Sequence, residues 1–296
     1  MTKSRVIIAL DFKNKADVLE FLDKFVEKPK NFYSMSRKLS AGLIDRLLKA
    51  DYKKLLNVIR KDQELSLEIR DKQAIVYHHK KKILTLCESK EAVLLSDGYL
   101  RENQVKPTLD LNNPSKYLNA AKEIVRSHSK QMEFMVQQNI AKSNQTQESK
   151  YFVVDMEYAF EQNMIAKEER LKKTRVDLVA IEKETNNIIL FELKYGLDAC
   201  CGNSGVDDHY EKIEKFLARE DFCAQLKSDI ANIISDKNRL GLIKFPINKA
   251  FEDIKMKYIF AYNSDKDLEK YRNEYANKYA EKGIETLYID TRYILK

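Results

Sequence analysis

Three side chains in two adjacent segments have the types and spacing for metal-assisted hydrolysis. Glu192 and Lys194 stand two positions apart at the end of the apolar segment 188–195, and Asp177 lies in the preceding apolar segment, 175–181. Residues i and i+2 of a strand face the same way, so Glu192 and Lys194 should project from one face. Two carboxylates and a lysine are a suitable site for Mg²⁺ and an attacking water molecule.

The apolar residues around these side chains predict two neighbouring strands. Four apolar residues in a row, 188–191, are typical of a central strand covered on both faces. A turn near 185–187 would join the two strands as a hairpin and bring Asp177 close to Glu192. Like charges that close need a compensating cation or a shared proton. The hairpin therefore predicts a site that attracts positive charge.

The segments around the hairpin predict an α/β domain with a mixed central sheet over residues 114–296. The expected order is one helix, three strands, helices, a strand, a helix and a strand. The helices are expected over 114–141, 206–217, 221–234 and 265–281. The strands are expected over 151–160, 174–181, 188–195, 256–262 and 285–290.

Residues 1–113 predict a small α+β region before that domain. A strand is expected over 6–10, helices over 16–26, 40–48 and 51–60, and a meander over 65–69, 74–77 and 83–86. This region has 23 basic and 16 acidic residues, whereas the rest of the chain balances at 30 and 30. The basic excess fits either a polyanionic partner or a solvated surface.

The pattern of Asp177, Glu192 and Lys194 resembles the PD-(D/E)xK nuclease superfamily, which has the restriction-endonuclease-like fold. The signature of that superfamily is an acidic residue on one strand and Glu-x-Lys on the next, within an α-β-β-β-α-β core. The resemblance covers roughly residues 114–262. Val176 precedes Asp177 where the signature has proline, a departure that is common in divergent members. The segments 155–158 and 202–209 resemble a subgroup of these proteins.

The resemblance implies a metal-dependent nuclease that hydrolyses phosphodiester bonds of nucleic acid, with DNA as the expected substrate. Asp177 and Glu192 would hold Mg²⁺, or Mn²⁺ in its place, together with the backbone carbonyl of Leu193. Lys194 would assist the attacking water and stabilise charge on the phosphate. The expected products carry a 5′-phosphate and a 3′-hydroxyl.

Further carboxylates extend the expected metal site. Glu157 alternates in phase with Asp155, so both side chains are expected to point into the site, with Glu157 as an added ligand. The alternative for Glu157 is an ordinary surface carboxylate. The long helix over 114–141 carries Glu123 and Glu133, either of which is a candidate for the accessory glutamate of this fold.

Basic residues near the hairpin are the candidates for substrate contacts. They are Arg175, His209, Lys172 and Lys173. The alternatives are a solvated arginine at a strand edge and a histidine that starts a helix. The segment 78–82, His-His-Lys-Lys-Lys, is expected to be a hairpin tip with solvated charge rather than a phosphate contact.

Composition excludes several other classes. The chain has 296 residues, 44% of them hydrophobic, without an apolar run of membrane-spanning length or a secretory leader, so a cytoplasmic protein without membrane contact is expected. It has no GxGxxG or Walker A loop and no CxxC pair, which disfavours dinucleotide, P-loop and zinc-ribbon functions. The alternative function is a catalytically inactive module that binds nucleic acid or a protein. The sequence is compatible with either a monomer or a homodimer.

Overall fold

The computed structural model describes residues 37–49, 51–88, 91–128, 132–159, 175–200, 205–262, 264–289 and 293–295. The chain divides into two compact units, Met1–Ser34 and Met35–Lys296, and all described residues belong to the second. The strand expected over 6–10 and the helix expected over 16–26 lie outside the described residues. The boundary expected between residues 113 and 114 stays a prediction.

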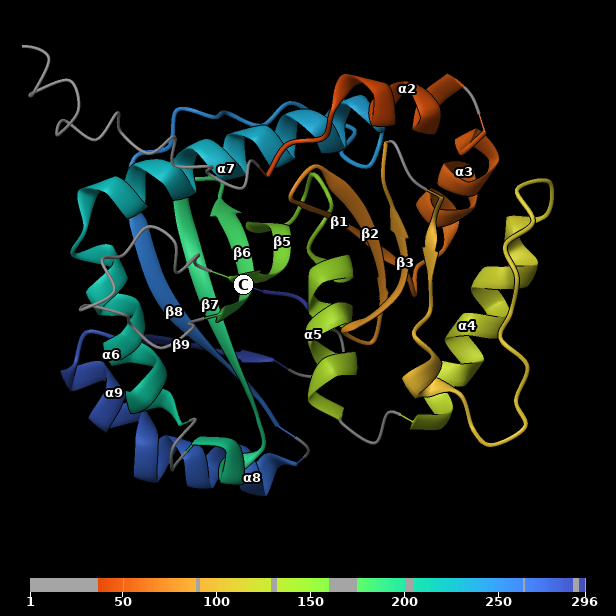
Figure 1. The fold of residues 1–296 in the computed structure, drawn as a ribbon. Helices are drawn as coiled ribbons and strands as arrows, with labels where there is room; N and C mark the ends of the chain where they lie inside the picture. The colour runs from red at the N-terminus through yellow and green to blue at the C-terminus, as the bar shows by residue number, and fades with distance from the viewer. Residues whose placement is uncertain are drawn as a thin grey trace, which may run out of the picture. The chain divides into compact units, whose positions relative to one another are not determined.

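A four-stranded antiparallel sheet follows the first helices, with the strand order β1-β2-β3-β4 (Figure 1). Its strands are β1 (Ser66–Arg70), β2 (Gln73–His78), β3 (Lys81–Leu86) and β4 (Val93–Leu94). Two-residue turns at 71–72 and 79–80 join the first three strands, and all four turn residues have positive φ, between 43° and 64°. A two-residue turn with positive φ at both positions matches the twist of the strands that it connects. The predicted meander is confirmed.

Helices cover this sheet and share its hydrophobic core. They are α2 (Ala41–Lys49), α3 (Lys53–Lys61) and α4 (Pro114–His128), and a 3-10 turn, η1 (Asp97–Tyr99), precedes α4. The Ser40 hydroxyl accepts a hydrogen bond from the Leu43 amide at 3.2 Å, as its place before α2 predicts. Glu64, just before β1, accepts hydrogen bonds from Lys122 and Arg126 of α4, which ties this helix to the sheet.

The second sheet has five strands in the order β5-β6-β7-β8-β9. The strands are β5 (Tyr151–Ala159), β6 (Arg175–Glu182), β7 (Asn187–Tyr195), β8 (Ile254–Ala261) and β9 (Glu285–Ile289). The first three are antiparallel, and β7, β8 and β9 are parallel, so the sheet is mixed as predicted. Residues 187–194 of β7 are all buried, which confirms a central strand.

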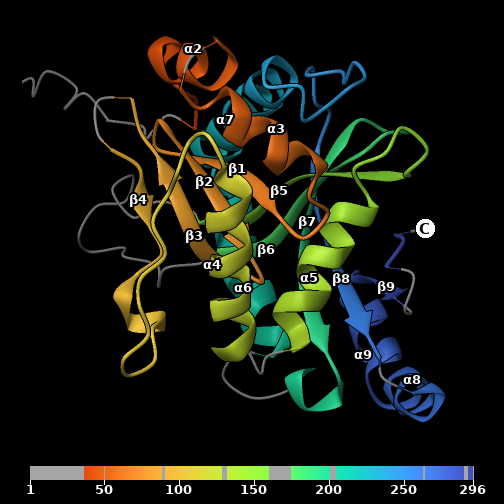
Figure 2. The same ribbon diagram turned by 90° about the vertical axis from the view of Figure 1, so that its right-hand side faces the viewer.

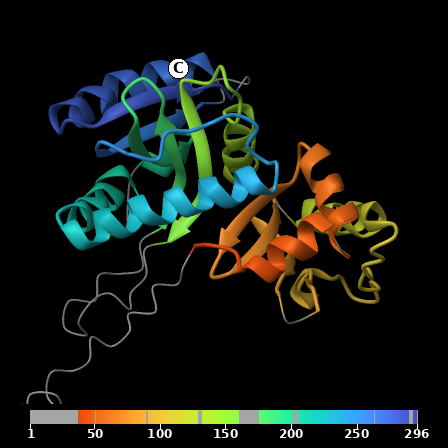
Figure 3. The same cartoon turned by 90° about the horizontal axis from the view of Figure 1, so that it is seen from above.

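Helices pack on both faces of the mixed sheet (Figures 1 and 3). They are α5 (Met132–Ser143), η4 (Leu197–Cys200), α6 (Val206–Leu217), α7 (Glu220–Arg239), α8 (Asp265–Tyr271), the π-helical turn η5 (Arg272–Ala276) and α9 (Asn277–Glu281). Ile188 and Leu190 of β7 share a core with α6 and α7, and Ile189 and Phe191 share a core with α5. No helix of the described residues is long and apolar enough to cross a membrane.

The single helix predicted over 114–141 is wrong, because α4 and α5 are separate helices. Figures 1 and 2 show α5 between the two sheets and α4 on the far side of the antiparallel sheet. Leu118 of α4 and Ile140 of α5 accordingly belong to different hydrophobic cores. Helical periodicity continues through both segments in sequence, but it carries no information about which core each one meets.

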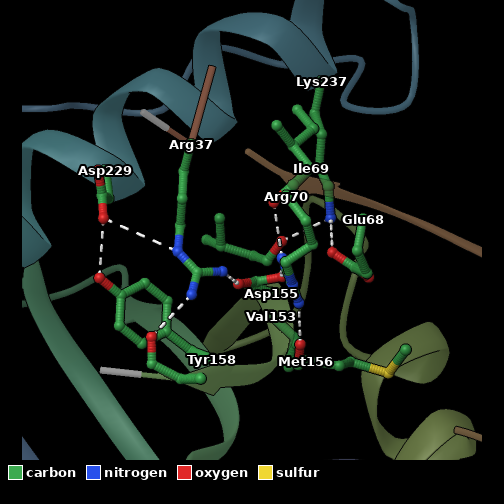
Figure 4. A network of polar contacts seen from close by, with 12 residues as sticks. Arg37, Glu68, Ile69, Arg70, Val153, Asp155, Met156, Tyr158, Asp229 and Lys237 are labelled. Carbon is green, nitrogen blue, oxygen red and sulfur yellow. Dashed lines mark hydrogen bonds and ion pairs between the residues drawn. The ribbon is translucent and has the colours of Figure 1, made fainter. Parts of the chain in front are cut away.

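A buried ionic network connects the two sheets around Asp155 of β5 (Figure 4). The Asp155 carboxylate lies 2.7 Å from Nη1 of Arg70, at the end of β1, and 3.5 Å from Nη1 of Arg37. Beside it, Lys237 of α7 contacts Oε2 of Glu68 at 2.6 Å. Burial alone would raise the pKa of Asp155, but the two arginines outweigh burial and lower this pKa below its usual value. The charged form of Asp155 therefore stabilises the contact between the sheets.

Removing this carboxylate should destabilise the protein strongly. Asp155→Asn leaves the buried guanidinium group of Arg70 without its carboxylate partner and leaves Arg37 with Asp229 alone, so the free energy of unfolding should fall by about 3 kcal/mol or more. The matched control is Asp51→Asn, which removes an exposed partner of Arg46 and should cost about 1 kcal/mol or less. Urea denaturation measures both, and equal costs would contradict the structural role of Asp155.

The contact between Glu64 and α4 predicts an acid-dependent loss of stability. Burial alone would raise the pKa of Glu64, but hydrogen bonds from Lys122 and Arg126 lower this pKa to about 2. A carboxylate with a lowered folded-state pKa stabilises the fold above its unfolded-state pKa, and this stability disappears as pH falls toward 2. Glu64 is half exposed, so the effect should be small.

Glu64→Gln removes this dependence. The variant should be less stable than the wild type at pH 7, and the difference should shrink toward zero as pH falls from about 4.5 to about 2.5. Urea unfolding over this range gives both free energies. Glu281→Gln, at an exposed glutamate of α9, is the control that should show no such trend.

Candidate active site

Asp177 and Glu192 lie opposite each other at one end of the β6–β7 hairpin. The pair Leu178–Phe191 fixes the register, and the next positions of the two strands are Asp177 and Glu192. The Leu193 amide donates a hydrogen bond to Oδ2 of Asp177 at 2.9 Å. Asp177 is 9% exposed and Glu192 is 3% exposed. Strand pairing therefore holds two carboxylates close together with little access to solvent.

Two cationic or titratable side chains meet the same oxygen of Glu192. Nζ of Lys194 lies 2.9 Å from Oε1 of Glu192, and Nδ1 of His209, on the first turns of α6, also lies 2.9 Å from it. The other oxygen, Oε2, is buried and has no hydrogen-bond partner among the described residues. The structure thus brings together Asp177, Glu192, Lys194 and His209, as the sequence predicts, and leaves one carboxylate oxygen unsatisfied.

Lys80, at the β2–β3 turn, reaches the same site from the antiparallel sheet. Its Nζ lies 2.6 Å from Oε1 of Glu157 and 3.4 Å from Oδ1 of Asp177, and the side chain is 17% exposed. The expectation of a solvated hairpin tip is wrong for this residue. The turn packs on α5, where the His79 amide donates to Oε1 of Gln138 and Nζ of Lys80 lies 4.6 Å from the Phe134 ring centre.

Glu157 points into the site, whereas Asp155 does not. Glu157 has φ of 57°, in the left-handed region, and the register of β5 shifts between Val153 and Asp155. A strained backbone and a bulge re-aim side chains at many functional sites. Oε2 of Glu157 pairs with Nη1 of Arg175 at 2.9 Å. The expectation that both carboxylates enter the site is wrong for Asp155, because Arg37 and Arg70 hold it in the buried network.

These side chains line one open cleft of about 470 Å³. Its lining residues are Lys80, Glu133, Glu157, Arg175, Asp177, Glu192, Lys194, Asp198, Ala199 and His209. Of the two glutamates considered for the accessory position, Glu133 lines the cleft, while Glu123 is exposed and pairs with Arg126. Lys172 and Lys173 lie outside the described residues.

Lys80 and Gln137 belong to the site, although the sequence did not single them out as site residues. Gln137 of α5 donates from Nε2 to Oε1 of Glu157 at 2.9 Å and to the Asp177 carbonyl at 2.6 Å, so it orients both strands. Gln137 is a polar residue at a buried helical position, which is a signal that sequence alone offers. Lys80 gives no such signal, because its place in a charged turn is typical of exposed residues.

Electrostatics at the cleft favour a bound cation. Burial, and then the negative charge of Glu192, raise the pKa of Asp177 well above its usual range. Burial also raises the pKa of Glu133. Burial alone would lower the pKa of Lys80, but the carboxylates of Asp177 and Glu157 outweigh burial and raise it. The cleft therefore brings five carboxyl groups together with three cationic side chains, Lys80, Arg175 and Lys194.

The oxygen atoms that the cleft offers suit a divalent cation that keeps several water ligands better than one that is coordinated by protein atoms alone. Asp177 and the unsatisfied Oε2 of Glu192 are hard oxygen donors, and Mg²⁺ binds one or two carboxylates while keeping several waters. Within the described part of the chain, no group of three or more His, Cys, Asp or Glu side chains is arranged to hold a metal ion. Lys80 separates Glu157 from Asp177, so Glu157 joins such a site only if Lys80 moves.

Comparison with known proteins gives no assignment at this point. No family model matches the chain, and neither curated proteins nor solved structures show a significant match to it. The fold and the cleft define a mixed α/β protein with an acidic site at the end of its central hairpin. Any function must be argued from that site.

Two of the buried aspartates, Asp177 and Asp155, should respond oppositely to the same substitution. Asp177→Asn replaces a carboxyl group whose charged form burial and Glu192 disfavour, so at neutral pH it should raise the free energy of unfolding by about 1 kcal/mol. Asp155→Asn, whose charge is paired, should lower it. Urea denaturation of the two variants side by side tests this difference, and destabilisation by Asp177→Asn would contradict the electrostatics of the cleft.

Proposed function

We propose that this protein is a metal-dependent nuclease that hydrolyses phosphodiester bonds of nucleic acid, with DNA as its substrate. The observation that carries the proposal is the placement of Asp177, Glu192 and Lys194 on neighbouring strands at an open cleft. The order α5, β5–β7, α6 and α7, β8 supports it, because it agrees with the α-β-β-β-α-β order of the restriction-endonuclease-like core.

Six residues in or next to the cleft have roles in this proposal. Asp177 and Glu192 hold Mg²⁺ together with the Leu193 carbonyl, and Mn²⁺ can take its place. The ion supplies the positive charge that draws a phosphate to two carboxylates. Lys194 holds a water molecule near Glu192 and stabilises negative charge on the phosphate. Arg175, whose side chain is about half exposed, contacts a neighbouring phosphate, and His209 keeps Glu192 oriented.

A second function has its own support. Lys80 already contacts Asp177 and Glu157, so the site is partly neutralised without a metal ion. A nuclease-fold module that binds nucleic acid or a protein without cleaving it would retain such a lysine. A measurement of metal binding distinguishes the two functions, because the nuclease requires a metal ion and the binding module does not.

Cleavage of a mixed panel of nucleic acids tests the nuclease proposal. Duplex, single-stranded and branched DNA and RNA are incubated with the full chain and Mg²⁺ or Mn²⁺. The wild type should cut at least one substrate, and Asp177→Ala and Lys194→Ala should each lower the rate by about 100-fold or more, since each removes a group that acts on the reacting phosphate. Asp51→Ala, at an exposed ion pair, is the control that should cut normally.

Calorimetric titration with Mn²⁺ completes the test. The wild type and Asp51→Ala should bind Mn²⁺, and Asp177→Ala should lose binding while its circular dichroism stays unchanged. Equal Mn²⁺ affinity in Asp177→Ala would show that the metal site is assigned wrongly. A wild type that neither binds Mn²⁺ nor cuts any substrate would favour the binding module.

A further inference from the structure

The candidate cleft continues into a second hollow on the antiparallel sheet. This second hollow, of about 540 Å³, shares Lys80, Glu157 and Arg175 with the cleft. From there it extends over Lys81, Lys82, Leu84 and Thr85 of β3 to β4 and Tyr99. β4 is the edge strand of its sheet (Figure 2). The two hollows therefore form one groove from Glu192 to the edge of the antiparallel sheet, and we call the second part the β3 groove.

Charge in the β3 groove is strongly positive. Its lining residues include five cationic side chains, Arg70, Lys80, Lys81, Lys82 and Arg175, and one carboxylate, Glu157. Arg70 is held by Asp155, and Lys80 and Arg175 are held by Glu157. Within the described residues, neither Lys81 nor Lys82 is in an ion pair. Their charges are therefore available to an anionic ligand.

Aromatic and apolar surface accompanies this charge. Tyr77 and Tyr99 line the groove, and Nζ of Lys81 lies 5.9 Å from the Tyr99 ring centre. Val93 of β4, also in the groove, is 57% exposed, although it is a large hydrophobic residue in a strand. Cationic side chains beside aromatic rings are the combination with which proteins bind single strands, because phosphates meet the cations and bases stack on the rings.

We infer that the β3 groove binds a single strand of nucleic acid and leads it to the candidate active site. Each hollow has the volume of a small-ligand pocket, which accommodates nucleotides of one strand rather than a duplex. Lys81 and Lys82 contact the phosphates, and Tyr99 stacks on a base. The inference rests on the proposed nuclease function for its substrate, but binding along the groove is measurable without cleavage.

Fluorescence anisotropy with a labelled oligothymidylate tests the inference. The full chain carries Asp177→Ala and is kept in EDTA, so that no cleavage occurs. Lys81→Gln/Lys82→Gln should weaken binding by about tenfold and reduce the slope of log affinity against log salt by about 1.4, since each single-strand phosphate contact contributes about 0.7. The control Lys255→Gln/Lys266→Gln removes two exposed lysines elsewhere and should change neither quantity.

Stacking is tested separately at Tyr99. Tyr99→Ala should weaken binding by about tenfold, and Tyr99→Phe, which keeps the ring, should bind like the parent chain. Equal unfolding midpoints of the variants show that their folds are intact. Unchanged affinity and salt slope in the Lys81/Lys82 variant, or tighter binding of a duplex of the same sequence than of the single strand, would overturn the inference.

The outcomes separate this inference from the nuclease proposal. Loss of binding in the groove variants, together with a wild type that cuts nothing, would support the groove and reject the nuclease. Cutting by the wild type, together with groove variants that bind and cut normally, would support the nuclease and reject the groove.

Discussion

The antiparallel pairing of β6 and β7 places two carboxylates side by side where water cannot fully screen them. Asp177 and Glu192 occupy opposite positions of the hairpin, and the Leu193 amide fixes the orientation of Asp177. Asp177 cannot turn away without losing this hydrogen bond, and both side chains are largely shielded from solvent. The surrounding structure must therefore supply positive charge, and the other elements of the site follow from that requirement.

Cationic or titratable side chains approach the two carboxylates from three directions. Lys194 reaches Glu192 from the same strand, Lys80 reaches Asp177 from the antiparallel sheet, and His209 approaches Glu192 from α6. Oε2 of Glu192 still lacks a partner. The cleft differs from the network around Asp155 in its electrostatics, because the two arginines lower the pKa of Asp155 whereas the pKa of Asp177 is raised. Paired buried charges stabilise the fold, and an incompletely paired cluster is typical of a site that acts on a ligand.

The antiparallel sheet contributes side chains to the candidate site in addition to stabilising the fold. Its β2–β3 turn places Lys80 against Glu157, and its strands β3 and β4 form the wall of the β3 groove. The contacts of Gln137 and Gln138 on α5 connect this sheet with the mixed sheet on either side of the helix. A single helix thus positions groups from both sheets toward one cleft.

The order of strands along the chain, the central position of β7 and the proximity of Asp177, Glu192 and Lys194 were determined by sequence alone, because apolar runs and alternation are local properties. Only the tertiary structure decided that α4 and α5 meet different cores, that Asp155 turns to the arginines, and that Lys80 enters the site. Each of these depends on tertiary contacts or on a bulge, and local periodicity contains neither. A charged turn looks the same in sequence whether it faces water or a carboxylate, and only packing distinguishes the two.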